Sequence, residues 1–534
     1  MLPSPGADSR RTPDKAGAEE VRYLGLSLLI MAAGCTPVGP DFARPEVETN
    51  PEWLEAELST FDTDMAELAG WWRQLDDPML DALISRALTQ NNSLEIAGLR
   101  VLEAQASLNL VRGNVYPQGQ VAVGDATALR ASENNANTAA GDLEFTQFNV
   151  GASISWEIDF WGRFRRGIEA AEANQLAALA AFDEAVVLLI ATVADVYTLI
   201  RATEEQLRLA RESAAIQQRS YEIVDLLFRR GDSSELDTLQ AKTLLLSTQA
   251  VIPGLEASLQ QAKNAMSALL GMMPSDIEDL LGGEARSLPV LPTEIRVGIP
   301  ADLLRQRPDV RRAELQALAQ NARVGVATAN LYPSFSLQGF LGLSASGNTD
   351  TTRTGDSGFG ELFSADSLTY SVGPAFVWPF LNYGRIRNDI RVQDARLQQA
   401  LIAFRESAIQ AAREVEDAMT AFARSREQDR ILRDTVAVAE RSAELSLLRY
   451  QEGFADYQRV INAQQALFNA QQRYAANRGA VTSNYIAIYR SLGGGWQSAK
   501  PWRLIDDETR RTMMERTDWG DLLEESPPQQ EQQP

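Results

Sequence analysis

The sequence predicts a mainly α-helical protein that is built twice from one long-helix unit and carries a pair of β-hairpins. Two stretches without glycine or proline, Ile168–Arg230 and Arg385–Glu452, are rich in the strong helix formers Ala, Leu, Glu, Gln and Arg. At a rise of about 1.5 Å per residue, each stretch can form a rod on the order of 100 Å long. An average globular helix has only about three turns, so a compact domain does not account for such rods.

Apolar residues follow both stretches at alternating steps of three and four. A sustained repeat of about seven residues predicts helices wound in a left-handed supercoil. Periodicity alone favours an ordinary dimeric coiled coil. The alanine-rich seams and their polar interruptions instead suit a sheet of helices with one wet face. The first seam includes Leu179, Phe182, Val186, Leu189, Val193 and Thr203, and the second includes Leu401, Phe404, Ala408, Ala411, Val415 and Ser425.

The two halves of the chain repeat each other. A shift of 222 residues superimposes the two seams and also the glycines that follow them, Gly231 and Gly453. A shift of 216 residues pairs two Asn-x-Tyr-Pro segments, Asn114–Pro117 and Asn330–Pro333. A period this long indicates a duplicated domain rather than a solenoid of short repeats.

The duplication predicts a domain organisation with two repeats between an N-terminal and a C-terminal extension. The N-terminal extension, signal peptide and lipobox occupy 1–35, followed by an extended arm over 36–70. The first repeat covers 71–300, with strands at about 118–158 and a long helix at about 163–230. The second covers 301–497, with strands at about 334–380 and a long helix at about 385–452, and 498–534 form a tail.

The segments between the helices carry the strand signals. Apolar and polar residues alternate in Phe148–Ile158 and Ser334–Ser344, and Gln120–Ala128 and Thr369–Trp378 are weaker candidates. Each half thus contributes one hairpin with about ten residues per strand, the length of a tilted membrane-spanning strand. A soluble sheet cap fits the hairpins alone equally well. Since the smallest transmembrane barrels need about eight strands, strands that cross a membrane require several chains to share one barrel.

Composition excludes several classes of function. The net charge of −22 argues against nucleic acid as a partner. The chain has no histidine, so imidazole metal sites and Ser-His-Asp or Cys-His nucleophile systems are ruled out. We find no phosphate-binding loop and no acid pair, and we therefore expect no enzyme, no cofactor and no metal. We also expect no membrane-spanning helix, because no apolar run approaches about 20 residues.

The only cysteine, Cys35, follows a short apolar run, Tyr23–Ala33, in the layout of a bacterial signal peptide. The segment that ends at Cys35 resembles a lipobox, in which the cysteine receives lipid and becomes the first mature residue. An incidental thiol is the alternative. Met1–Glu20 is polar and acidic and does not suit a signal peptide, so we expect translation to begin at Val21.

Five segments together resemble the TolC-like outer-membrane efflux lipoproteins of the OprM/NodT type. The resemblance extends over about residues 35–497, and its Trp-Trp and Gly-Gly-Gly-Trp segments are the most diagnostic. The five segments are Cys35–Pro45, Trp71–Ile84, Gly231–Ala241, Tyr450–Gly453 and Leu492–Trp496.

This resemblance implies a homotrimer in the cell outer membrane, with a shared 12-stranded β-barrel to which each chain gives four strands. A periplasmic tunnel of twelve helices continues from the barrel. An RND-type inner-membrane pump feeds it through a periplasmic adaptor protein, and outer-membrane lipid surrounds the barrel. The implied function is a passive exit duct for small molecules such as drugs. The alternatives are a type I protein-secretion channel and a periplasmic coiled-coil scaffold that spans no membrane.

Both rods end at a glycine-containing turn. Glycine suits a left-handed cap after Arg230, at Gly231, and again at Gly453, and this structural role alone explains the glycines. In the family that the chain resembles, these hairpin tips also meet the adaptor. The resemblance therefore implies a docking role for Arg230, Gly231 and Gly453.

The resemblance also places a gate near the tips. The family commonly has an acid after the second turn, and here Asn462 stands in its place. Three asparagines carry no charge and can still form hydrogen bonds. Arg459 lies one turn earlier and is expected to pair with Asp456 or with an acid on a neighbouring helix. A plain solvated Arg459 is equally consistent with the sequence.

Overall fold

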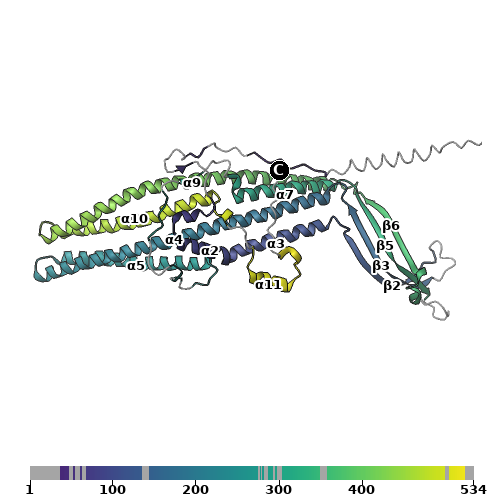
Figure 1. Cartoon of the computed structure of the whole chain (residues 1–534), viewed down its shortest axis with the longest axis horizontal. Helices are drawn as coiled ribbons and strands as arrows, with labels where there is room; N and C mark the ends of the chain where they lie inside the picture. The colour runs from purple at the N-terminus through teal and green to yellow at the C-terminus, as the bar shows by residue number, and fades with distance from the viewer. Residues whose placement is uncertain are drawn as a thin grey trace, which may run out of the picture. The chain divides into compact units, whose positions relative to one another are not determined.

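The computed structural model consists mainly of long antiparallel helix pairs and a four-stranded sheet (Figure 1). The structure describes residues 37–46, 52–54, 61–62, 68–134, 143–274, 277, 279–281, 287–292, 295–297, 304–348, 358–498 and 504–523. The helices are α2 (Pro78–Gln90), α3 (Asn92–Gly113), α4 (Arg163–Arg230), α5 (Glu235–Leu269), α7 (Pro308–Ala329), α8 (Gly358–Glu361), α9 (Arg385–Gln451), α10 (Tyr457–Ser491) and α11 (Asp507–Arg516). The strands are β1 (Phe61–Asp62), β2 (Gly119–Arg130), β3 (Glu144–Ile158), β4 (Ile295–Arg296), β5 (Ser334–Asn348) and β6 (Leu368–Val377).

Contacts divide the chain into two compact units whose boundaries do not follow the sequence repeats. The first unit comprises 1–43, 106–174 and 317–400 and contains the four-stranded sheet. The second comprises 44–105, 175–316 and 401–534 and contains both helical hairpin tips. The boundaries fall inside α3, α4, α7 and α9, so each of these helices belongs partly to both units.

The two glycine- and proline-poor stretches form the predicted long helices. Helix α4 has 68 residues and α9 has 67, so each is about 100 Å long. Small residues bring the helices close together in the second unit, where a Cβ added to Gly479 would lie 2.8 Å from the Cβ of Ala202. The polar interruptions Thr203 and Ser425 are buried rather than wet. Each is hydrogen-bonded, and Asn484 Nδ2 donates to Ser425 Oγ over 3.1 Å.

Helix α4 contains the most apolar stretch of the described helices. Among the described residues, α4 contains an 18-residue window with a mean hydropathy of 2.1, so by length and composition it could cross a membrane. Within the protein, 56% of that window is buried. The main hydrophobic core of the second unit includes Val186, Ile190 and Val193 of this helix. Packing inside the protein therefore accounts for its apolar character.

The predicted hairpins are joined into a single antiparallel sheet with the order β2-β3-β5-β6. Each hairpin pairs its own strands, and β3 of the first repeat also pairs with β5 of the second along its whole length. Strands β2 and β6 are the edge strands. Pro374 lies in β6, which is compatible with its lack of an N–H donor because an edge strand pairs on one side only.

Candidate functional site

The sheet has one apolar face, and this face is exposed in the chain. Directly opposite residues of neighbouring strands lie on the same face, and the pairs Val150–Leu343 and Leu341–Tyr370 define it. Soluble proteins rarely leave such a continuous apolar patch uncovered. Its exposed side chains are Val150, Ile154, Ile158, Phe335, Leu337, Leu341, Leu368, Tyr370, Val372 and Phe376.

The opposite face of the sheet carries polar side chains that are hydrogen-bonded across strands, together with the exposed Val121, Val123 and Leu129 of β2. Asn149 of β3 lies opposite Asp125 of β2 and Ser344 of β5. Its amide donates to the carboxylate of Asp125 over 3.1 Å, and the hydroxyl of Ser344 donates to its carbonyl oxygen over 2.8 Å. An apolar outer face with a polar inner face is the arrangement of a transmembrane barrel that encloses water.

The two strand-to-helix corners are built alike in both repeats. The indole N–H of Trp156 donates to the backbone oxygen of Val115 over 3.0 Å. In the second repeat, the indole of Trp378 donates to the backbone oxygen of Leu331 over 3.1 Å. Each pair of residues is related by the sequence shifts of 222 and 216. The duplication seen in the sequence is therefore retained in the hydrogen bonding.

An N-terminal arm crosses these corners within the first unit. The backbone N–H of Val38 donates to the backbone oxygen of Trp161 over 3.0 Å. The side-chain amide of Asn321 donates to the backbone oxygen of Pro40 over 2.9 Å. At the closest approach, a Cβ added to Gly39 would lie 2.4 Å from the Cα of Gly325. Because the two backbones approach so closely that no side chain fits between them, the arm is fixed against α7 and against the start of α4. Cys35 itself lies outside the described residues.

The two most diagnostic sequence segments pack on each other in the second unit. The ring of Trp71 is 1% exposed and stacks on Tyr489 with centroids 5.2 Å apart. A Cβ added to Gly494 would lie 3.1 Å from Trp71 Cδ1, and one added to Gly495 would lie 2.9 Å from Ile190 Cδ1. The glycines thus leave the space that the tryptophans fill.

Sequence reasoning missed the polar groups that hold this region together. Asp77 accepts from the backbone N–H of Met79 at the start of α2 and from the hydroxyl of Tyr197 over 2.6 Å. Burial, followed by this hydrogen bond, raises the pKa of Tyr197 to about 12. The only available signal was Asp77 before Pro78, a combination that favours a helix start.

A second missed group is the buried guanidinium of Arg307. It bonds to the carboxylates of Asp309 and Glu414, each over 2.8 Å, and to the backbone oxygen of Ser491. A buried charge is stabilised only when it is paired and hydrogen-bonded, and this one is. Its partners are up to 184 residues away in sequence, so local patterns could not identify them.

The hairpin tips carry the predicted caps. Gly231 has φ +84° and Gly453 has φ +79°, the left-handed region that favours glycine. After α4, the backbone N–H of Asp232 donates to the backbone oxygen of Leu227 over 2.8 Å. After α9, the backbone N–H of Phe454 donates to the backbone oxygen of Arg449, also over 2.8 Å. These bonds form the Schellman motif. A Cβ added to either glycine would meet no atom within 4 Å, so only backbone conformation requires glycine.

The gate candidates lie on the exposed first turns of α10. Asp456 precedes the helix without capping it through its side chain, and Arg459 Nε lies 3.8 Å from Asp456 Oδ1. Both side chains are more than 70% exposed, so this ion pair contributes little within one chain. The carbonyl oxygen of Asn462 accepts from Gln458 over 3.0 Å. The three residues are thus close together and face away from the core of their own chain.

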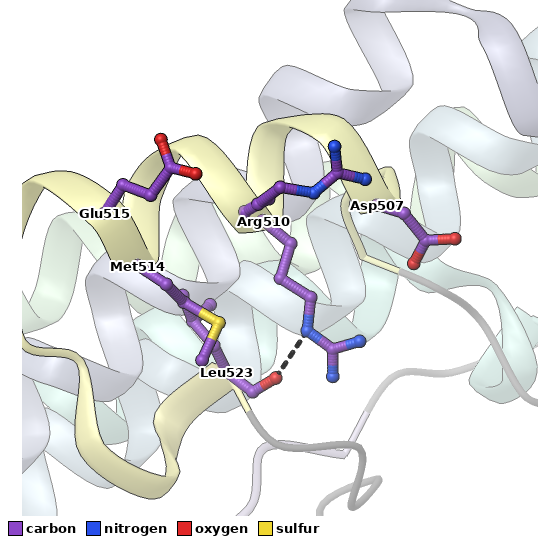
Figure 2. A pocket seen from close by; sticks show the side chains of 6 residues that line it. Asp507, Arg510, Met514, Glu515 and Leu523 are labelled. Carbon is purple, nitrogen blue, oxygen red and sulfur yellow. Dashed lines mark hydrogen bonds between the residues drawn. The ribbon is translucent and has the colours of Figure 1, made fainter.

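The C-terminal tail packs on α3 within the second unit. Trp519 contacts a small cluster formed by Leu102, Met513 and Leu523. A surface hollow of about 520 Å³ lies beside α11, and Arg510 there donates to the backbone oxygen of Leu523 over 2.8 Å. Figure 2 shows residues that line this hollow. The hollow is an open surface feature and brings together none of the predicted site residues. Trp502, another tryptophan of the tail, lies outside the described residues.

Comparison with known proteins identifies the family. The family model for the outer membrane efflux protein matches residues 83–272 and 299–494, so the chain belongs to this family. The toluene efflux pump outer membrane protein TtgF of Pseudomonas putida is 31% identical over 90% of this chain and 98% of that protein. The probable outer membrane lipoprotein SilC of Salmonella typhimurium is 29% identical over 89% of this chain and 99% of that protein.

A solved structure supports the same conclusion for the fold. The outer-membrane channel OprN is 30% identical, with a TM-score of 0.79 over 86% of this chain and 99% of that chain. The predicted fold class is therefore confirmed: a duplicated long-helix protomer of a trimeric tunnel that gives four strands to a shared barrel. The predicted location in the outer membrane, with a periplasmic helical part, is confirmed as well.

Proposed function

We propose that three copies of this chain form the passive outer-membrane exit duct of a tripartite efflux system. The observation that carries this function is the sheet with an exposed apolar face, a hydrogen-bonded polar face and two unpaired edges, attached to paired long helices. Four strands cannot close a barrel, whereas three such sheets supply twelve. A periplasmic adaptor and an RND-type inner-membrane pump deliver small molecules to the duct, which has no chemistry of its own.

The outcome expected from the proposed function is a heat-modifiable, detergent-extracted trimer in the outer-membrane fraction. A deletion strain should also become sensitive to pump substrates and recover with the cloned chain. A protein-secretion duct would instead restore export of a polypeptide and leave drug resistance unchanged. A periplasmic scaffold would leave the outer-membrane fraction empty of the protein.

The division into repeats over 71–300 and 301–497 remains a proposal. The separate matches of the family model over 83–272 and 299–494 support it. We also propose that Cys35 carries the lipid anchor. The described arm begins at residue 37, two positions later, and is fixed against the strand-to-helix corner.

Cys35→Ser should prevent lipidation and reduce assembly without releasing the protein from the membrane. A single acyl-type anchor binds a membrane weakly compared with a complete barrel. Radiolabelled palmitate incorporation should be lost, while the trimer remains in the outer-membrane fraction at a lower level. Recovery of the variant as a stable soluble monomer would contradict the barrel.

We propose a periplasmic gate formed by Asp456, Arg459 and Asn462. These side chains are exposed on the first turns of α10, where Arg459 pairs with Asp456 and Asn462 accepts from Gln458. Their exposure suits contacts with a neighbouring helix of the trimer. A charged or hydrogen-bonded ring at a constriction sets the ion selectivity of a pore. In this proposal, Arg459 acts as a latch that holds the closed state through an ion pair. Asn462 from each of the three copies forms an uncharged, hydrogen-bonding ring.

Two substitutions separate these roles. Arg459→Ala should raise single-channel conductance in planar bilayers and sensitise cells to large antibiotics, because the latch is removed. Asn462→Asp should increase cation selectivity and create a periplasmic site at which divalent cations block, because three carboxylates replace three amides. Arg441→Ala is a matched control, since Arg441 pairs with Glu444 on the exposed surface of α9. Conductance and selectivity identical to wild type in both gate variants would place the constriction elsewhere.

We further propose that Arg230, Gly231 and Gly453 form the adaptor-docking surface at the two hairpin tips. The tips are exposed, and both are closed by the same backbone motif. A small aromatic and aliphatic cluster of Val224, Tyr457 and Val460 fixes them to each other within the second unit. The two turns therefore present a firm surface rather than loose loops.

A further inference from the structure

The first unit contains one completed joint between the two repeats. Trp161, directly before α4, stacks on Tyr332 with ring centroids 4.5 Å apart and an interplanar angle of 23°. Its indole N–H donates to the backbone oxygen of Pro333 over 2.8 Å. An aromatic ring of repeat one thus lies on the Tyr-Pro corner of repeat two.

The duplication provides the same two halves of the joint a second time. The shift of 222 places Tyr383 at the position of Trp161, and the shift of 216 places Tyr116-Pro117 at that of Tyr332-Pro333. Here the halves are apart. Tyr383 is 97% exposed and Tyr116 is 70% exposed. Among the described residues, neither ring contacts another aromatic ring.

Both exposed halves already have the backbone geometry of the completed joint. Gly162 after Trp161 has φ +77°, and Gly384 after Tyr383 has φ +82°. The following helices start with equivalent bonds, from Arg166 N–H to the oxygen of Gly162 over 2.8 Å and from Asn388 N–H to that of Gly384 over 2.9 Å. The Tyr-Pro corners match as well, through the indole bonds of their tryptophans described above.

Tyr383 is also held in an unusual conformation. Its φ of +48° is rare for a residue with a side chain, and such backbone persists where the surroundings fix it. The described part of the chain leaves the ring almost wholly uncovered. Among the described residues, no surface of the same chain covers this ring, so the ring is available to another molecule.

We propose that Tyr383 of one copy stacks on the Tyr116-Pro117 corner of the partner subunit and closes the ring of the trimer. This inference rests on the proposed trimeric duct. Repeat one meets repeat two inside a chain through Trp161 and Tyr332, and repeat two meets repeat one of the next chain through Tyr383 and Tyr116. Such a head-to-tail contact forms a closed ring when the rotation permits. The unpaired sheet edges β6 and β2 belong to the same two repeats and take part in the same closure.

Thiol cross-linking in the full-length protein tests this contact. Cells that express Tyr116→Cys together with Tyr383→Cys are treated with a short bis-maleimide, and dimers and trimers are expected after boiling in SDS. Each single variant should give monomer only. Tyr332→Cys with Tyr383→Cys is the matched control, because both thiols then lie in repeat two and the proposed contact offers them no intermolecular partner.

Heat stability of the trimer provides a second measurement. Tyr383→Ala and Tyr116→Ala should each lower the temperature at which the SDS-resistant trimer dissociates. The double variant should dissociate at a temperature no lower than that of the less stable single variant, because the effects of substitutions at two residues in contact do not add. Tyr383→Trp restores the residue of the completed joint and should preserve or raise that temperature.

The outcomes separate this contact from the duct itself. A wild-type trimer without cross-links in the double-cysteine variant, together with additive effects of the two alanine variants, would overturn the contact. Rings that face lipid headgroups instead would give that result. Absence of any wild-type trimer would overturn the proposed duct.

Discussion

Gly453→Asp is expected to abolish efflux while leaving a folded trimer in the outer membrane. The new carboxylate would project into open space at the tip of the second hairpin, where no atom lies within 4 Å of the added Cβ. The left-handed φ of +79° costs a non-glycine residue only about 1–2 kcal/mol. The proposed adaptor, in contrast, would have to bury an unpaired charge. Minimum inhibitory concentrations and immunoblots of unboiled outer membranes measure the two effects.

Two matched variants make this result interpretable. Gly453→Asn adds a side chain of the same size without charge, and Asn tolerates left-handed backbone better than most residues. It should retain more resistance than the Asp variant. Gly231→Asp places the same charge on the first tip, which has the same cap. Wild-type resistance in Gly453→Asp would reject the docking role.

Trp71→Ala is expected to give the largest loss of stability. The indole is almost fully buried between Tyr489, Tyr485 and the glycines of the Gly-Gly-Gly-Trp segment. Truncation of a buried Trp to Ala costs about 3–5 kcal/mol, which is a large part of the free energy of unfolding of a typical domain. The amount of SDS-resistant trimer, and the temperature at which it dissociates, should both fall sharply.

Trp519→Ala is the control for this variant. Trp519 is only partly buried, on the tail cluster beside α11. Its loss should leave the trimer near its wild-type level. Trp71→Phe should lie between the two, because it keeps part of the stack on Tyr489. Wild-type assembly of Trp71→Ala would show that the Trp–Gly packing contributes little.

Local chemistry explains which parts of the fold the sequence could predict. Uninterrupted helix formers specified α4 and α9, and alternation of apolar and polar residues specified β3 and β5. The capping glycines were predictable because φ is a local property. The pairing of β3 with β5 was not, since it depends on contacts between residues nearly 200 positions apart.

The candidate sites were less predictable for a physical reason. Exposed side chains such as Arg459 and Asn462 are not determined by the packing of their own chain, and the gate that we propose for them involves a neighbouring subunit. The carboxylates around Arg307 and the Tyr197–Asp77 bond were missed because long-range polar pairs leave no periodic pattern. The apolar window of α4 was missed because charged residues interrupt it, although its average hydropathy is high.

The fixed arm across the strand-to-helix corner determines how far a lipid at Cys35 could reach. Two extended residues span at most about 7 Å, and Pro37 already lies against Gly162 at the start of α4. The proposed acyl chains would therefore enter the bilayer beside the periplasmic rim of the barrel, at a height set by the protein. In this arrangement the anchor would set the depth of each protomer in the bilayer. It would align the apolar face of the sheet with the hydrocarbon layer before the three sheets close, rather than hold a finished channel in place.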